Sequence, residues 1–135
     1  MKKVTTYIIY LSSLCLVMAC STSDAPTPDT LSELINKWKV ESVLVGTTDV
    51  TAQYTNYTIE FKEDNTYLLT KADGGNEEGS WVISSDNKTI TITPTGGTAI
   101  SFTETNISAT KLTYNAEEVS AKTGTVTVTF TLIPA

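Results

Sequence analysis

Residues 125–132 read Thr-Val-Thr-Val-Thr-Phe-Thr-Leu, a strict alternation of threonines with larger apolar side chains. Because successive side chains of a β-strand point to opposite faces, this pattern predicts a strand with its apolar side chains buried and its threonines in water. Threonine, which is β-branched and polar, suits the solvated face of a sheet. We therefore expect a sheet that is covered on one face only.

The same two-residue period recurs along the chain, as in Tyr57-Thr58-Ile59-Glu60-Phe61. Segments rich in turn-forming residues separate the alternating runs, at residues 63–65, 73–76, 85–88, 94–97 and 106–110. The predicted strands are eight, at about residues 38–46, 55–62, 66–71, 79–84, 89–94, 99–106, 111–118 and 124–133. Short antiparallel strands with short connections indicate an all-β domain, either an up-and-down barrel or a sandwich.

A helical period precedes the first of these strands. Apolar side chains recur there every three or four residues, at Leu31, Leu34, Ile35 and Trp38. Thr30 suits the position that caps a helix, with Glu33 completing a capping box. So short a helix is not stable alone. We therefore expect a short N-terminal helix over residues 30–37 whose apolar stripe packs on the strands.

The first twenty residues have the layout of a secretory signal. Lys2 and Lys3 precede an apolar run over residues 7–18, which is too short for a transmembrane helix of about 20 apolar residues. Val17-Met18-Ala19-Cys20 resembles the lipobox of bacterial lipoproteins, in which the cysteine becomes the first mature residue and is acylated, with palmitate among the chains. The resemblance implies a signal peptide at 1–19, lipid on Cys20 and attachment to a membrane through it.

A polar segment follows the cysteine. Residues 21–29 read Ser-Thr-Ser-Asp-Ala-Pro-Thr-Pro-Asp, and the prolines favour an extended chain. We expect residues 20–30 to form a flexible tether to a domain over residues 31–135. Ser21 resembles the sorting residue of outer-membrane lipoproteins, with the periplasmic and the surface face both left open. Asp29-Thr30-Leu31 also resembles an acceptor for O-glycosylation on Thr30.

The charge of the chain excludes some partners. All nine basic residues are lysines, and two of them lie in the predicted signal peptide. Seven lysines then face fifteen acidic residues, a net charge of −8. Phosphate contacts and base reading depend on clustered Lys and Arg, so we expect no nucleic acid partner. Attraction to anionic lipid headgroups is also excluded, which leaves the acylated cysteine as the means of membrane attachment.

The residue types that catalysis uses most are missing from the mature chain. It has no histidine, Cys15 lies in the predicted signal peptide, and the Cys20 thiol is expected to carry lipid, so no free thiol remains. Glu77-Glu78 and Glu117-Glu118 border turns, and adjacent residues of a strand point apart, so we expect solvated charges rather than a glycosidase pair. The oxygen-bearing residues at 73–77 fit no calcium-binding loop. We expect no enzyme, no metal site and no cofactor.

The order of aromatic landmarks resembles the lipocalin-like domains of small bacterial lipoproteins. A short helix leads into Trp38, Phe61 precedes a turn and Thr66-Tyr67, and Gly79-Ser80-Trp81 opens a later strand. Asn36 stands where the lipocalin Gly-x-Trp hallmark has its glycine. The resemblance covers about residues 31–135 and implies an eight-stranded antiparallel up-and-down barrel with a short N-terminal helix.

An eight-stranded barrel is just wide enough to be filled by side chains or to hold one small ligand. The aromatic residues that are either core or the lining of a ligand cavity are Trp38, Tyr57, Phe61, Tyr67, Trp81 and Tyr114. We expect a membrane-anchored protein whose barrel binds a small apolar or amphipathic ligand in the cell envelope. The alternative is a solid barrel that serves as an interaction or structural subunit of an envelope complex.

Overall fold

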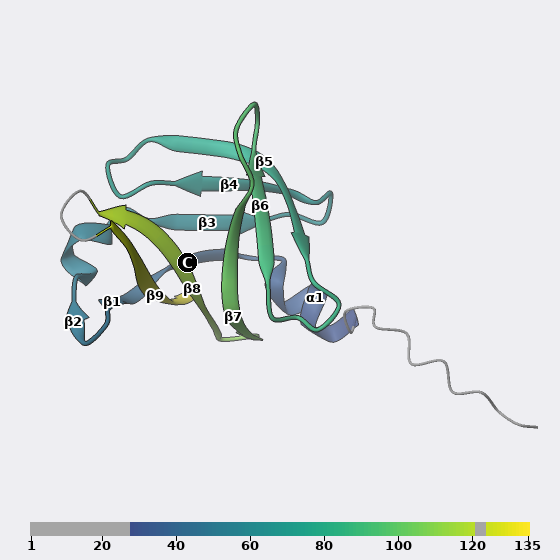
Figure 1. Cartoon of the computed structure of the whole chain (residues 1–135). Coiled ribbons are helices and arrows are strands. Elements are labelled where there is room, and N and C mark those ends of the chain that lie inside the picture. Colours follow the sequence, from purple (N-terminus) through teal and green to yellow (C-terminus); the bar gives the residue numbers. More distant parts are fainter. Residues whose placement is uncertain (1–27, 121–123) are drawn as a thin grey trace, which may run out of the picture.

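The computed structural model describes residues 28–120 and 124–135. Helix α1 (Pro28–Leu34) comes first, and a 3₁₀ turn, η1 (Thr51–Tyr54), lies between the second and third strands. The strands in this part of the chain are β1 (Lys37–Val45), β2 (Thr48–Asp49), β3 (Thr58–Phe61), β4 (Thr66–Thr70), β5 (Asn76–Ile83), β6 (Ile90–Pro94), β7 (Ile100–Ser108), β8 (Lys111–Ser120) and β9 (Gly124–Pro134). Figure 1 shows their arrangement.

Eight of these strands form a closed barrel. They are antiparallel to their neighbours in the order β1-β3-β4-β5-β6-β7-β8-β9, and β9 pairs back with β1. The start of β1, Lys37–Lys39, pairs with β3, and Trp38–Val45 pairs with β9, so β1 completes the ring. The two-residue β2 pairs with the end of β1 outside it. The prediction of an eight-stranded up-and-down barrel with a short N-terminal helix is confirmed, and a sandwich is excluded.

The alternation that predicted the strands also predicted much of the core. In β3, Ile59 and Phe61 are buried, and in β9 the buried residues are Val128, Phe130 and Leu132, while the threonines between them are at least partly exposed. Burial of each large apolar side chain contributes roughly 1.5–3 kcal/mol. The period of two thus fixes the direction of these side chains, and closure of the barrel turns one face of every strand inward.

Helix α1 covers one end of the barrel and lies against β7. Leu34 is fully buried, and its carbonyl oxygen accepts a hydrogen bond of 3.0 Å from the Trp38 indole. The helix begins at Pro28 and ends at Leu34, earlier at both ends than the predicted 30–37. It ends early because the next residues join the sheet: the Phe61 amide donates to the Asn36 carbonyl (3.0 Å).

The predicted tether therefore ends sooner than expected, because residues 28–30 belong to α1. Thr30 is half-buried on this helix. The predicted signal peptide (1–19), Cys20 and residues 21–27 lie outside the described residues. Within residues 28–120 and 124–135, no helix has the length and hydrophobicity that a membrane crossing requires.

Several strand boundaries differ from the predicted ones, by up to three residues, and those of β5 and β7 show the reason. Strand β5 starts at Asn76 rather than at residue 79, because Asn76 already pairs with Thr70 of β4. Strand β7 runs through Asn106, where a turn was predicted, and ends at Ser108. The turn follows at residues 109–110, where the Ser108 hydroxyl accepts a hydrogen bond from the Lys111 amide at 3.1 Å. Strand pairing outweighs the turn preference of asparagine at both places.

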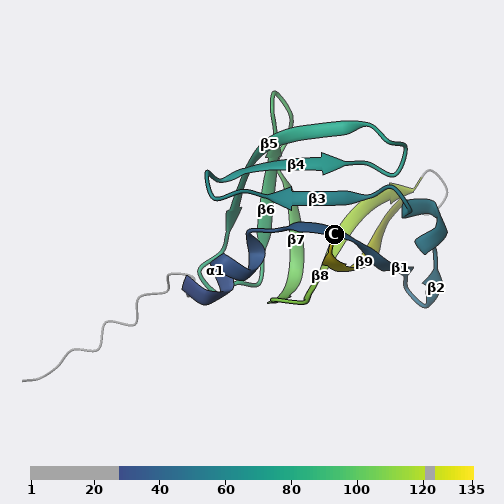
Figure 2. The ribbon, with the colours of Figure 1, turned by 180° about the vertical axis from the view of Figure 1, so that it is seen from behind.

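The 3₁₀ turn η1 lies at the opposite end of the barrel from α1. The helix leads into the start of β1, whereas η1 follows the end of β1 and β2. Figures 1 and 2 show α1 and the β2–η1 segment on opposite sides of the molecule. The turn from β4 to β5 and the end of β8 lie at the η1 side. A cluster of tyrosines and charged side chains lies at this second end of the barrel.

Candidate functional site

The barrel end at η1 carries a cluster of tyrosines and charged side chains. Its members, which we call the tyrosine mouth, are Tyr54, Tyr57, Tyr67, Lys71, Asp73, Glu77, Tyr114 and Glu118. They come from η1, from the chain before β3, from β4, from the turn between β4 and β5, from β5 and from β8. Segments distant in sequence therefore meet at one end of the barrel.

The alternation of side chains along β5 and β8 places one carboxylate from each strand in the mouth. In β5, Glu77 lies on the same face as the buried Trp81, four residues later. In β8, Glu118 lies on the same face as the buried Tyr114 and Ala116. Because β5 begins and β8 ends at the mouth, the inward positions nearest these strand ends are open to water and tolerate charge.

Glu77 is held by a hydroxyl and an ammonium group. The Tyr67 hydroxyl donates to Glu77 Oε1 at 3.0 Å, and Lys71 Nζ lies 2.7 Å from Oε2. The hydrogen bond to this carboxylate, with its charge, raises the pKa of Lys71. Burial raises the pKa of Tyr67, and the hydrogen bond to Glu77 raises it further. Tyr67 is thus a fixed donor, and Glu77 has its charge balanced inside the protein.

Glu118 has a tyrosine donor but no ammonium partner in the described part of the chain. The Tyr54 hydroxyl lies 2.9 Å from Oε1 and 3.0 Å from Oε2. The ion pairs among residues 28–120 and 124–135 are Lys71 with Glu77 and Lys111 with Glu41. Burial, followed by the hydrogen bond to Glu118 and its charge, raises the pKa of Tyr54 to about 12. Tyr54 therefore stays protonated and donates to Glu118.

Aromatic rings fill the barrel beneath the mouth. Phe102 stacks on Tyr114 with ring centroids 4.3 Å apart, and Tyr114 stacks on Phe130 at 5.1 Å. Tyr57 packs on Phe130 at 5.2 Å, and its hydroxyl lies 2.9 Å from that of Tyr114. Burial raises the pKa of both tyrosines. All four residues are buried, so their rings occupy the interior of the barrel beneath the mouth.

The mouth contains a surface depression of about 310 Å³. Its lining is Tyr54, Tyr57, Lys71, Ala72, Asp73 and Glu118. The volume is at the lower end of the roughly 300–1,000 Å³ of ligand pockets. Its lining combines two tyrosines with charged side chains, which suits a small molecule with an apolar part and a polar head.

The structure divides the six candidate residues from the sequence into two groups, and all six are buried. Three contribute to the mouth: Tyr57 lines the depression, Tyr67 donates to Glu77, and Tyr114 lies beneath with its hydroxyl on that of Tyr57.

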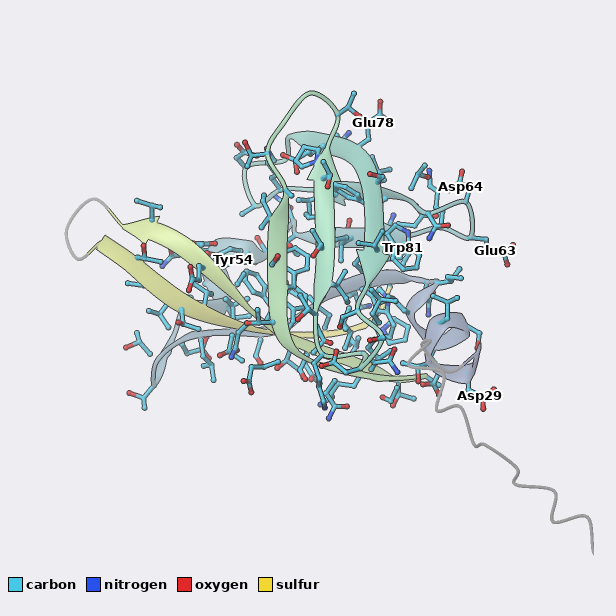
Figure 3. The ribbon with its side chains drawn as sticks, turned by 45° about the vertical axis from the view of Figure 1, so that its right-hand side comes forward. Asp29, Tyr54, Glu63, Asp64, Glu78 and Trp81 are labelled. Carbon is cyan, nitrogen blue, oxygen red and sulfur yellow. The ribbon has the colours of Figure 1, made fainter. Side chains whose placement is uncertain are left out.

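The other three, Trp38, Phe61 and Trp81, pack away from the mouth. The Trp38 indole donates to the carbonyl of Leu34 in α1, and the Trp81 indole donates to the Lys62 carbonyl at 3.2 Å. The Phe61 and Trp81 rings meet edge to face, 5.5 Å apart. Figure 3 shows Trp81 on the side of α1 and Tyr54 toward the opposite side, beside β8 and β9.

Sequence reasoning missed five residues of the mouth: Tyr54, Lys71, Asp73, Glu77 and Glu118. A signal for the two glutamates was present, since the period of two extends from Trp81 back to Glu77 and from Tyr114 forward to Glu118. For Lys71 the period of Tyr67 and Leu69 also extends to it, since the predicted strand reaches residue 71. Tyr54 and Asp73 lie outside the predicted strands, where no period assigns a direction. Among the described residues, no three acidic, His or Cys side chains are placed to hold a metal ion.

Comparison with known proteins agrees with this architecture. A family model for a lipocalin-like domain matches residues 34–114. No curated protein has a sequence that matches the chain. The matched segment covers more than half of the chain and runs from the end of α1 to Tyr114 in β8. Together with the closed eight-stranded barrel, the match shows that this chain belongs to the family of lipocalin-like domains.

Proposed function

We propose that the protein is a membrane-anchored lipoprotein of the cell envelope whose barrel binds a small amphipathic ligand at the tyrosine mouth. The observation that supports binding is the depression of about 310 Å³ with tyrosine walls and charged groups at the uncovered end of the barrel. The apolar part of the ligand would lie on the rings of Tyr54 and Tyr57, and its polar part would face the charged side chains.

Lipid on Cys20 would attach the protein to the outer membrane. The lipobox-like Val17-Met18-Ala19-Cys20, the polar segment after it and the acidic composition support this part of the proposal. Each buried methylene of an acyl chain contributes roughly 0.8 kcal/mol, so several chains give stable anchoring. Helix α1, which follows the predicted tether in the chain, lies at the end of the barrel opposite the mouth, so an anchor before α1 would leave the mouth uncovered.

The binding part is tested by asking what the protein carries when it is purified from membranes. The full chain is extracted with solvent and analysed by mass spectrometry, beside the variant Ala72→Trp, whose indole fills the depression. Thr110→Trp, at the exposed turn between β7 and β8, is the control for adding a tryptophan. We expect one amphiphile enriched with the wild type and the control and lost with Ala72→Trp. The same extract from all three proteins contradicts binding at the mouth.

The anchoring part is tested by labelling cells with palmitate. We expect label on the wild type and on Cys15→Ala, whose change lies in the discarded leader, but none on Cys20→Ala. The membrane-derived wild type should begin at Cys20 in its N-terminal peptide mass. Label that persists on Cys20→Ala would show that the lipid-anchor proposal is wrong.

A second candidate function is that of a solid barrel that binds another envelope protein. The rings of Phe102, Tyr114 and Phe130 that fill the barrel favour it. So do apolar side chains on the outside, among them Val119 with an exposed fraction of 87%. Cross-linking in intact envelopes distinguishes the two candidates, because a partner at Val119 would be lost in Val119→Lys while the ligand at the mouth would remain.

A further inference from the structure

We propose that the polar head of the ligand is an ammonium group, bound by Glu118 beside the rings of Tyr54 and Tyr57. This inference rests on the proposed ligand-binding function and adds the chemical class of the ligand. The two inward carboxylates of the mouth, Glu77 and Glu118, differ in their partners.

Glu77 shows what a carboxylate of this mouth binds. One of its oxygens accepts a tyrosine hydroxyl, from Tyr67 at 3.0 Å, and the other binds an ammonium group, from Lys71 at 2.7 Å. Glu118 has the same first partner, a tyrosine hydroxyl, from Tyr54 at 2.9 and 3.0 Å. An ionised carboxylate has about four acceptor sites, so Glu118 retains capacity after this bond. The counterpart of Lys71 is what Glu118 lacks among the described residues.

The surroundings of Glu118 suit a cation from outside. Tyr54 and Tyr57 line the same depression as Glu118. A cation within about 6 Å of a tyrosine ring is attracted to its face. The Tyr54 ring is held edge to face on Phe130, with centroids 5.3 Å apart and an interplanar angle of 87°, so its position is fixed before a ligand arrives. The Glu118 carboxylate and the Tyr54 ring are therefore both held in place beside the depression.

An anionic head does not fit the same depression. Two carboxylates line it, those of Glu118 and Asp73, and the ammonium group that lines it, Lys71, is already paired with Glu77. An anion would have to break that pair or face two like charges. An uncharged head would leave the exposed Glu118 carboxylate with the Tyr54 hydroxyl and water as its partners, and so would gain nothing from its charge. An ammonium group satisfies the carboxylate and leaves the Lys71–Glu77 pair intact.

The test uses three probes with one tail: hexylammonium, hexanol and hexanoate. The full chain, in a neutral detergent and with fluorine-labelled tyrosine, is titrated with each probe and followed by ¹⁹F NMR at Tyr54 and Tyr57. We expect hexylammonium to bind about tenfold more tightly than hexanol, and hexanoate more weakly than either. Glu118→Gln should remove the preference for hexylammonium. Glu117→Gln, the same charge change on the neighbouring exposed residue, is the matched control and should keep it.

The outcomes separate this inference from the proposed function. If all three probes shift the two tyrosine signals with equal affinity, the mouth binds amphiphiles but the ammonium preference is wrong. If none of them shifts either signal, the binding function itself fails, and the inference fails with it. A preference for hexylammonium that survives in Glu118→Gln would overturn the role of Glu118.

An ammonium head occurs both in free amphiphilic amines and in aminophospholipids. A fourth probe, a phosphatidylethanolamine with two six-carbon chains, distinguishes these sources. Tighter binding than that of hexylammonium assigns the ligand to the lipid class. Weaker binding assigns it to free amines, because the added phosphate then meets the carboxylates of Glu118 and Asp73 unfavourably.

Discussion

Tyr57 and Tyr114 bring two hydroxyl groups together inside an otherwise apolar set of rings. Their oxygens are 2.9 Å apart and buried, and the neighbouring rings are Phe102 and Phe130. A buried hydroxyl without a partner is costly, so each of the two depends on the other. Alternation along the strands predicted that both residues face inward, but it did not predict that they meet, because they lie 57 positions apart in the sequence.

We predict that Tyr57→Phe and Tyr114→Phe each destabilise the fold by about 1–2 kcal/mol, because the remaining hydroxyl loses its partner. The double variant should lose less than the sum of the two, since no hydroxyl is then left unpaired. Urea denaturation followed by tryptophan fluorescence measures all three. Strictly additive losses would show that the hydrogen bond does not couple the two residues.

At the scale of the element, strand β5 depends on a close approach to β6. Gly79 pairs with Pro94 at the end of β6, and a Cβ atom at Gly79 would overlap the carbonyl oxygen of Thr93. The motif Gly79-Ser80-Trp81 resembles the lipocalin-like family in sequence. The steric need for its glycine, however, arises only when β6 lies beside β5. Glu77 of the mouth lies two residues before Gly79, so the same stretch of β5 also positions the site.

We predict that Gly79→Ala destabilises the domain by about 3 kcal/mol, because backbone atoms of β6 must shift to make room. Ser80→Ala, next in the strand and exposed, is the control and should change stability by less than about 0.5 kcal/mol. Thermal unfolding of both variants provides the comparison. An unchanged melting temperature for Gly79→Ala would mean that β5 and β6 separate easily at this position.

At the scale of the whole molecule, four buried or half-buried tyrosines link stability to pH. The pKa of Tyr54 is raised to about 12 by burial and by Glu118, and burial also raises the pKa values of Tyr57, Tyr67 and Tyr114 above the usual 10. In the unfolded chain these hydroxyls would lose their protons near pH 10, whereas the folded chain keeps them. Unfolding therefore releases protons at alkaline pH and becomes more favourable there.

We predict that stability is independent of these tyrosines below about pH 9 and falls steadily from pH 10 toward pH 12. The urea midpoint, measured across this range, should fall less steeply in Tyr54→Phe, which removes one of the four groups. A midpoint that stays constant up to about pH 11.5 would show that the tyrosines titrate in the folded barrel as they do in water.

The sequence by itself determined the class of fold and the direction of most core side chains, because a period of two assigns each residue of a strand to one face. It also predicted the helix before the first strand and the landmarks Trp38 and Trp81. Only the tertiary structure decided that the eight strands close through β1 and β9, since the pairing of the first strand with the last is not a local property. The tyrosine mouth likewise depends on the tertiary structure. Tyr54 meets Glu118 from 64 positions away, and only the closed barrel brings the two together.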